Sequence, residues 1–368
     1  MKIALVHDYL NQYGGGERVL EAFTKIWPQA PIFTLLYDEQ GTGRAFAGKK
    51  IYTSFLQKIP GVKKHHRLFS FLMPLAVEQF DLSKYDLILS DSASYAKGVI
   101  TRPQTLHICY CHTPIRYAWD DSHKYIEEFG YGGLVKFFIP FFINYVRLWD
   151  EAASARPDYY LTNSSFVAGR IKKYYHRESL VVHPPIKTNL FYIAEKPQDY
   201  FLAVGRFLPY KRFDLIIKAF NKLGLPLKIV GGGPQEKYLK SIAKPNIKFV
   251  GLVSDGELKD YYACCRAFIF PQEEDFGMVA AEAMASGRPV IAYAGGGALE
   301  MVEEGKSGIF FRRQKVNDLV AAVQKFQNLA FDSRYIREKA LRWDEERFKE
   351  KVKKIVEERY LEFKNSGF

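Results

Sequence analysis

The sequence predicts a protein of two α/β domains, each built on a doubly wound parallel sheet. Three observations lead to this fold class. The chain has 368 residues, which is more than a single hydrophobic core usually serves. Short apolar runs of the kind that form buried parallel strands alternate with helical patterns. The pair Pro184–Pro185 then interrupts this alternation, as a linker between two domains would.

The predicted strands fall into two series. The first opens with KIALVHDYL, followed by a glycine cluster and the helical pattern ERVLEAFTKIW, and it continues with buried strands at residues 85–91, 105–112 and 158–165. The second contains five strands, at residues 201–206, 227–234, 247–253, 267–271 and 289–297. We therefore expect an amino-terminal domain over residues 1–187 and a carboxy-terminal domain over residues 188–344. The segment 345–368 carries an apolar stripe of helical period, and we expect it to complete the first domain.

The composition favours an anionic partner. The chain carries 53 Lys and Arg against 41 Asp and Glu, a net charge of +12, which suits nucleic acid, a phosphate-rich small molecule or an acidic membrane. Four cysteines, two of them adjacent, do not make a disulfide framework. No secretory signal is recognised before the first strand, and the apolar stretch 137–146 is too short to span a bilayer. We therefore expect a cytoplasmic protein that associates peripherally with the cytoplasmic face of the membrane.

The stretch FPQEEDFGMVAAEAMASG, residues 270–287, is the most informative for chemistry. Glu274 and Glu282 lie on either side of a predicted loop-to-helix transition at Gly277. Backbone N–H groups at such a helix start can bind an anion, while a carboxylate further along can accept from hydroxyls of the same ligand. The stretch VGRFLPYKRFD adds Arg206 and Lys211 just beyond a predicted strand. Two cations at that place would stabilise a diphosphate.

These motifs resemble the E-x7-E signature and the accompanying Arg and Lys of family 4 glycosyltransferases, and the resemblance extends over nearly the whole chain. It implies the GT-B fold, in which two facing Rossmann-like doubly wound domains hold a nucleotide sugar in the cleft between them. It implies that Glu274 acts on the donor sugar and that Arg206 and Lys211 act on its diphosphate. It also implies that Glu282 binds the nucleotide ribose. Further donor contacts are implied for Gly232, Val253, Phe276, Gly277, Met278 and Val279.

A glycine cluster marks the first strand-to-helix turn. Gly14, Gly15 and Gly16 precede Glu17, so the backbone there can approach a phosphate closely. The resemblance places Gly15 and Gly16 near the donor phosphates and makes Glu17 a candidate for the acceptor side of the cleft. A plain tight turn is the alternative.

The stretch HICYCHTPIRYAWD, residues 107–120, contains two cysteines between two histidines. On a strand, His107, Cys109 and Cys111 share one face, so the four side chains cannot converge on a metal, and we predict buried cysteines and no metal site. His112 falls where the strand ends, at the edge where doubly wound sheets bind ligands. It resembles the family's cleft histidine, which implies a catalytic role near the reacting carbon.

The pattern HTPxRYxW further resembles a bacterial subset of mannosyltransferases that use GDP-mannose. Arg116, Tyr117 and Trp119 are accordingly candidates for the cleft wall or the acceptor site, with core packing as the alternative for Trp119. The resemblance implies a retaining hexosyltransferase that moves mannose from GDP-mannose to a glycan or lipid-linked glycan in surface polysaccharide synthesis. No carboxylate can be assigned as a nucleophile, which favours same-face substitution. No D-x-D pair is placed to hold a metal on the diphosphate, so we expect no metal and no cofactor.

A basic segment suggests a membrane partner. Residues 40–77 contain no Asp or Glu, and residues 49–77 combine a closing apolar run, LFSFLMPLAV, with six cations: Lys49, Lys50, Lys58, Lys63, Lys64 and Arg67. Such a segment suits an anionic lipid surface. A solvated basic face over a buried helix is the alternative.

Two other functional classes fit less of the sequence. A nicotinamide-dependent oxidoreductase or epimerase would explain the glycine cluster followed by Asp38, but the G-x-G-x-x-G spacing is missing. A nucleic-acid-binding protein would explain the charge, but no binding module is recognisable, and we expect no nucleic acid partner.

Overall fold

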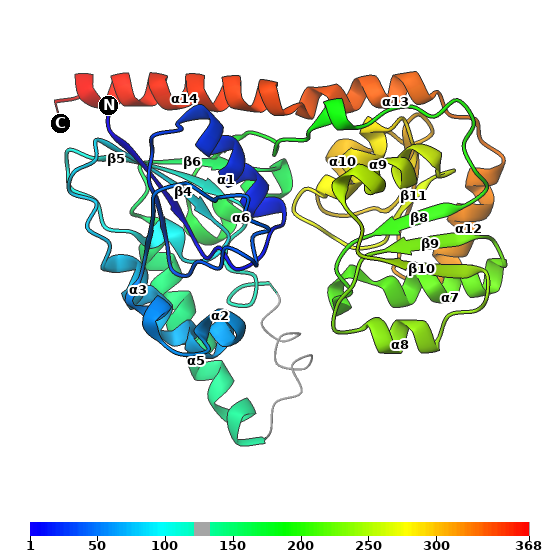
Figure 1. Ribbon diagram of the computed structural model, residues 1–368, viewed down its shortest axis with the longest axis horizontal. Helices are drawn as coiled ribbons and strands as arrows, with labels where there is room; N and C mark the ends of the chain where they lie inside the picture. Colours follow the sequence, from blue (N-terminus) through cyan, green and yellow to red (C-terminus); the bar gives the residue numbers. More distant parts are fainter. Residues whose placement is uncertain (121–132, 368) are drawn as a thin grey trace. The chain divides into compact units, whose positions relative to one another are not determined.

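The computed structural model describes residues 1–120 and 133–367, with the side chains of all these residues except Lys64, Arg67 and residues 133–137. The chain divides into two compact units (Figure 1). Unit 1 comprises Met1–Pro185 and Phe348–Phe368, and unit 2 comprises Ile186–Arg347.

Unit 1 is built on a seven-stranded sheet in the order β3-β2-β1-β4-β5-β6-β7, with all neighbours parallel. The strands are β1 (Ile3–His7), β2 (Ile32–Thr34), β3 (Ile51–Thr53), β4 (Leu87–Ser92), β5 (Leu106–Cys111), β6 (Tyr159–Thr162) and β7 (Leu180–Val181). The central strands β1, β4 and β5 are buried along their whole length. Two of them, β1 and β4, open with consecutive apolar residues, IALV and LIL, because helices cover both faces of the sheet.

The helices of unit 1 lie on both faces of this sheet (Figure 1). They are α1 (Gly15–Ile26), η1 (Phe55–Lys58), α2 (Val62–His65), η2 (His66–Leu72), α3 (Met73–Glu78), η3 (Ala96–Gly98), α5 (Gly133–Ser154), α6 (Ser165–Tyr175) and α14 (Glu345–Asn365), which begins in unit 2. On one face Phe23 of α1 stacks on Phe348 of α14, with ring centroids 5.9 Å apart. On the other face α3 and α5 share a core through Met73 and Val146.

Unit 2 contains a six-stranded sheet in the order β10-β9-β8-β11-β12-β13, again parallel throughout. The strands are β8 (Phe201–Val204), β9 (Leu227–Val230), β10 (Ile247–Gly251), β11 (Phe268–Phe270), β12 (Val290–Tyr293) and β13 (Gly308–Phe311). The helices are η4 (Thr188–Leu190), η5 (Pro209–Lys211), α7 (Phe213–Leu223), α8 (Glu236–Ser241), α9 (Asp255–Cys264), α10 (Met278–Ala285), α11 (Ala298–Met301), α12 (Val316–Gln327), α13 (Ser333–Ala340) and η6 (Leu341–Trp343).

Every strand predicted from the sequence is present, which confirms the prediction of two doubly wound α/β sheets. The sequence pattern does not reveal β2, β3, β7 and β13, each of which has only two to four residues.

Both sheets reverse their strand order beside their first strand. The chain proceeds from β1 outward through β2 and β3 and then returns to β4 on the other side of β1. In unit 2 it proceeds from β8 through β9 and β10 and returns to β11. The carboxyl ends of the pairs β1/β4 and β8/β11 therefore mark the topological switch points, where doubly wound sheets bind ligands.

Candidate active site

At the switch point of unit 1, the carboxylate of Asp91 forms hydrogen bonds with two histidines, His7 and His112. His7 is the last residue of β1 and is paired in register with Asp91 of β4, while His112 directly follows β5. Oδ2 of Asp91 lies 2.8 Å from Nδ1 of His7, and Oδ1 lies 2.6 Å from Nε2 of His112. An ionised carboxylate only accepts hydrogen bonds, so both imidazole nitrogens donate to it. Asp91 thereby fixes the orientation of both rings.

Glu17 lies on the other side of His7. Its Oε1 is 3.9 Å from Nε2 of His7, and its Oε2 accepts a 2.8 Å hydrogen bond from the backbone N–H of Gly14. The second contact caps the amino terminus of α1. Both His7 and Glu17 are buried, so Glu17 is engaged in holding His7 and the start of α1.

These contacts set the charge of the cluster. Burial alone would lower the pKa of His7, but its hydrogen bond to Asp91 and its ion pair with Glu17 outweigh burial and raise that pKa to about 10. Burial likewise opposes protonation of His112, but the Asp91 carboxylate raises the pKa of His112 above its usual 6.5. Although burial works in the opposite direction, the charge of His112 and the hydrogen bonds from both imidazoles lower the pKa of Asp91. At neutral pH the cluster therefore contains an ionised Asp91 and a protonated His7, and it favours protonated His112.

Gly16 brings the start of α1 against both histidines. A Cβ atom added at Gly16 would lie 3.5 Å from Nε2 of His112 and 3.7 Å from Cε1 of His7. Gly15 is the first residue of the helix, so Gly15 and Gly16 contribute backbone N–H groups at its amino terminus, where intrahelical acceptors are missing. The structure thus brings His112, Gly15, Gly16 and Glu17 together.

The remaining candidates of unit 1 take part in packing. Nε1 of Trp119 donates to the buried carboxylate of Asp150 at 2.7 Å, which favours the core-packing role for Trp119. The hydroxyl of Tyr117 lies 2.5 Å from that of Tyr95. The carbonyl of Arg116 accepts from the backbone N–H of Trp119 at 3.2 Å, so Arg116 belongs to the same turn.

The cysteines of β5 are buried, as predicted from the alternation of that strand. Cys109 and Cys111 pack against Val167 and Ile171 of α6. His107, on the same face, lies 2.8 Å from the hydroxyl of Ser90. Within residues 1–120 and 133–367, no group of three His, Cys, Asp or Glu residues has an arrangement that could hold a metal ion.

The switch point of unit 2 joins two sequence motifs. Lys211 closes η5 after β8, and Glu274 follows the adjacent strand β11; their side chains form an ion pair. The two side chains are 15% and 16% exposed, so both are largely shielded from water. An ion pair in such surroundings is screened less by solvent than a surface pair.

The loop that carries Arg206 is held by the glycine run after β9. The N–H of Phe207 donates to the carbonyl of Gly232 at 2.9 Å. Gly231 has a φ of 140°, and a Cβ atom there would lie 1.9 Å from the carbonyl oxygen of Gly205. Only glycine permits this approach. The side chain of Arg206 is exposed at the same carboxyl edge of the sheet.

Helix α10 begins at the predicted loop-to-helix transition. Its N-cap, Gly277, has a φ of 99°, so Met278 and Val279 supply the first backbone N–H groups of the helix. Glu282 is buried in the next turn, where its Oε2 accepts a 2.9 Å hydrogen bond from the hydroxyl of Tyr262. Phe276 is buried against Trp343 with ring centroids 5.5 Å apart.

Val253 is half-buried just after β10, immediately before the Ser254 cap of α9. Gly232 follows β9, the neighbouring strand. Both therefore lie on loops at the carboxyl edge of the sheet in unit 2.

The basic segment 49–77 lies in unit 1 and includes β3, η1, α2 and η2. Lys50, Lys58 and Lys63 are exposed, and Lys49 is half-buried. The side chains of Lys64 and Arg67 lie outside the described part of the structure. None of the described helices combines the length and apolar composition needed to span a bilayer.

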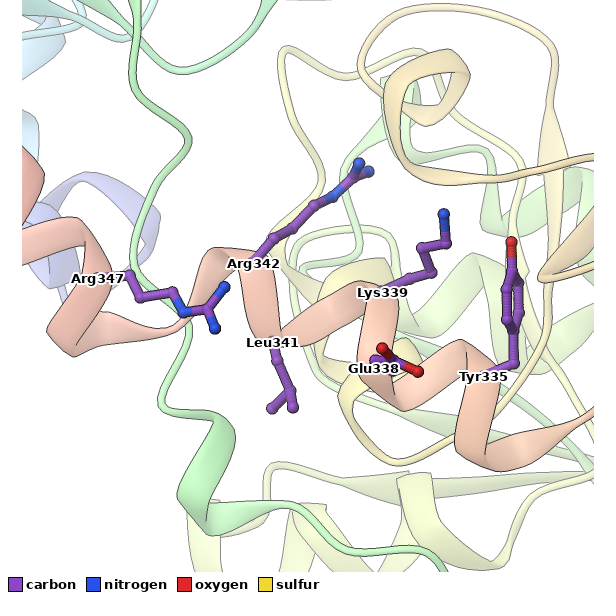
Figure 2. A pocket seen from close by; sticks show the side chains of 6 residues that line it. All are labelled: Tyr335, Glu338, Lys339, Leu341, Arg342 and Arg347. Atoms are coloured by element: carbon purple, nitrogen blue, oxygen red, sulfur yellow. The ribbon is translucent and has the colours of Figure 1, made fainter.

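A surface hollow of about 530 Å³ in unit 2 is lined by none of the residues predicted from the sequence. Figure 2 shows its lining, which comes from α13, η6 and the start of α14: Tyr335, Glu338, Lys339, Leu341, Arg342 and Arg347. Two of its cations are already engaged, because Lys339 pairs with Glu303 at 2.7 Å and Arg342 donates to the carbonyl of Glu300 at 2.7 Å. The hollow is therefore not the site that the motifs indicate.

The residues selected from the sequence did not include His7 and Asp91. Both stand at the carboxyl end of a predicted strand, in VHD and LSD. That is the criterion that singled out His112, so the signal for the whole cluster was present in the sequence.

A family model matches most of the second unit. Residues 188–350 match the model described as Glycosyl transferases group 1. The matched segment is less than half of the chain. It contains Arg206, Lys211 and Glu274, so the ion pair at the switch point lies within it.

Two curated relatives match parts of the chain. One is the uncharacterized glycosyltransferase MJ1178 of Methanocaldococcus jannaschii, 27% identical over 187 residues, which are 50% of this chain and 53% of that protein. The other is a GDP-mannose-dependent alpha-mannosyltransferase of Corynebacterium glutamicum, 30% identical over 142 residues, 38% of this chain and 34% of that protein. The chain thus spans about half, or less, of the length of the curated relatives it matches.

The fold is shared over the whole length of a solved structure. Anabaena Alr3699/HepE, solved in complex with UDP and glucose, has a TM-score of 0.69 and 18% identity, and the match covers 97% of this chain and 99% of that chain. At this identity the likeness shows the fold alone. Together with the match to the Glycosyl transferases group 1 model, it confirms the predicted GT-B fold with two Rossmann-like domains.

Proposed function

We propose that this chain is a retaining, metal-independent glycosyltransferase. Its donor is GDP-mannose, and its acceptor is a glycan or lipid-linked glycan in the synthesis of a surface polysaccharide. The observation that carries the proposal is the ion pair between Lys211 and Glu274. The pair brings together Lys211, from the motif that the resemblance assigns to the donor diphosphate, and Glu274, from the motif that it assigns to the donor sugar. The name of the Corynebacterium glutamicum relative supports GDP-mannose as the donor.

The ion pair suits both proposed roles at once. A lysine ammonium has three N–H donors, so Lys211 can pair with Glu274 and still donate to phosphate oxygens. Glu274 has a second oxygen that can accept from a hydroxyl of the sugar. The shielded Lys211, together with Arg206 on the loop after β8, would stabilise the negative charge that develops on the departing nucleoside diphosphate.

The nucleotide is held by the loops around α10 on this proposal. Met278 and Val279 donate backbone hydrogen bonds to the donor, and Glu282, oriented by Tyr262, accepts from the ribose hydroxyls. Gly232 and Val253 lie on the loops proposed to contact the nucleotide. Gly15 and Gly16 are proposed to approach the donor phosphates.

The reaction proposed is a substitution on one face of the sugar. The bond between the anomeric carbon and the phosphate oxygen breaks, the acceptor oxygen bonds to the same face, and the departing phosphate takes the acceptor's proton. His112 touches the donor sugar in this scheme. Because its Nε2 donates to Asp91, the Nδ1–H of the protonated ring is the donor that faces the sugar. Asp91 is then a positioning residue.

A lipid-linked acceptor would bring the protein to a membrane. We propose that the segment 49–77 faces an anionic lipid surface at the cytoplasmic side. Its exposed cations, Lys50, Lys58 and Lys63, support this proposal because each basic side chain near such a surface is attracted to it.

A thermal-shift screen tests the donor. The full chain is heated with GDP-mannose, UDP-glucose, ADP-glucose or dTDP-glucose, each with and without EDTA. Ligand binding at 100 times Kd stabilises the folded state by about 2.7 kcal/mol, so GDP-mannose should raise Tm equally in both buffers. A shift with UDP-glucose alone would overturn the choice of donor, and a shift that EDTA abolishes would overturn metal independence. No shift with any of the four sugars would contradict the proposed function.

A further inference from the structure

Helix α5 is apolar on both of its faces. Ile139, Ile143 and Val146 are buried and face the rest of unit 1. The side chains of Phe141, Tyr145 and Leu148, which recur at helical spacing, are 65%, 45% and 60% exposed. A surface helix of a globular protein normally presents a polar face to water. An apolar outer face on a helix that is already packed indicates a surface that meets something other than water.

A second exposed apolar stripe lies on the neighbouring segment. Leu68 and Phe71 of η2 and Leu75 of α3 are 66%, 53% and 49% exposed, again at helical spacing. Isolated exposed apolar side chains are normal on soluble proteins. Here six exposed apolar side chains form two stripes of three residues each on adjacent elements, so they are not isolated.

The two stripes belong to elements that pack together. Met73 and Val77 of α3 share a core with Val146 of α5, and Nε1 of Trp149 on α5 donates to Glu78 on α3 at 2.8 Å. Figure 1 shows α2, α3 and α5 together at one end of unit 1. The elements that carry the two stripes are therefore neighbours.

The charge around this region is mostly positive. No Asp or Glu occurs between Gln40 and Val77, nor along α5 from Gly133 to Trp149, although Glu78 ends α3 and the exposed Glu151 lies one turn beyond Leu148. Lys58 at the end of η1 and Lys63 in α2 are exposed. Acid-free segments that combine exposed apolar side chains with lysines complement an anionic bilayer, since the apolar groups enter the headgroup region and the ammonium groups meet lipid phosphates.

We propose that the outer face of α5 and the η2–α3 segment form one surface that docks on an anionic lipid bilayer. This deepens the proposed lipid-linked acceptor by naming the elements that hold the enzyme at the membrane. The apolar stripe contributed by α5 lies outside the segment 49–77 that the sequence indicated. The docking itself requires no donor, no acceptor and no turnover.

Vesicle flotation tests this surface. The full chain is mixed with vesicles of phosphatidylcholine alone or with phosphatidylglycerol added, and the fraction that floats is measured. The chain should float with the anionic vesicles only. L75S/L148S, which shortens both stripes, and K58E/K63E, which reverses the adjacent charge, should each reduce the partition coefficient at least about tenfold.

A matched control and a second measurement complete the test. L361S changes a leucine of α14 that is 62% exposed and should float like the unaltered chain. All variants should keep the Tm and the GDP-mannose shift of the unaltered chain, so failure of the donor assay and failure of flotation are separate results. Undiminished flotation of L75S/L148S would overturn the proposal. A dimer in sedimentation that L75S/L148S dissociates, with no flotation of the unaltered chain, would assign the surface to a second copy and overturn it too.

Discussion

Asp91 and His112 are joined by a 2.6 Å hydrogen bond between Oδ1 and Nε2 at the carboxyl ends of adjacent strands β4 and β5. The carboxylate raises the pKa of His112 against the effect of burial. Removing the charge of Asp91 while keeping its shape should therefore lower the pKa of His112. D91N should reduce kcat/KM for GDP-mannose consumption on the order of 100-fold.

The pH profile distinguishes this role from a merely structural one. Activity that needs protonated His112 falls as pH rises through its pKa, so D91N should move the alkaline limb of the profile to lower pH. The GDP-mannose Tm shift should persist, since Asp91 does not contact the nucleotide in the proposed scheme. A D91N enzyme with the unaltered alkaline limb would rule out this positioning role.

The same cluster predicts how stability depends on pH. The pKa of His7 is raised from 6.5 to about 10 in the folded chain, so the folded state binds a proton more tightly than the unfolded state. The resulting stabilisation is fully present below pH 6.5 and is lost as pH rises toward 10. H7Q, which keeps a hydrogen-bonding side chain without the charge, should lower Tm most at pH 6. The gap between H7Q and the unaltered chain should narrow by pH 10, and a gap that is constant from pH 6 to pH 10 would contradict the charge assignment.

Lys211 and Glu274 should matter for transfer far more than for folding. Exposed ion pairs contribute about 1 kcal/mol or less, and this pair, though shielded, lies on loops at the edge of the sheet. K211A and E274A should therefore leave the chain folded while reducing transfer on the order of 100-fold or more. K218A is the matched control, because Lys218 is an exposed lysine of the same unit that pairs with Asp214 at 3.6 Å. Near-normal transfer rates in K211A or E274A would reject the assigned roles.

Much of this architecture follows from the sequence, for physical reasons that also explain what was missed. Buried parallel strands such as β1 open with a run of consecutive apolar residues, IALV, so their pattern is visible without the structure. The pairing of Lys211 with Glu274 depends on β8 and β11 being neighbours, which is a property of strand order that local patterns do not contain. His7 and Asp91 stand at strand ends, as His112 does, but their contact across 84 residues of sequence depends on the pairing of β1 with β4, which local patterns do not contain. For Trp119 the sequence leaves the cleft wall and core packing open, and its hydrogen bond to Asp150, 31 residues away, cannot be seen in the motif itself.

The glycine run after β9 provides a test of backbone geometry at the proposed donor site. In G231A the added methyl group would lie 1.9 Å from the carbonyl oxygen of Gly205, so the loop that carries Arg206 must move. We expect a loss of at least about 3 kcal/mol in the free energy of unfolding and loss of the GDP-mannose Tm shift. Gly224 is the matched control, because it also has a positive φ, 70°, but nothing lies within 4 Å of an added Cβ. G224A should cost only about 1 kcal/mol and keep the GDP-mannose shift, since it adds backbone strain without displacing the loop. Equal losses in G231A and G224A would mean that strain in φ, rather than contact between the two loops, governs this position.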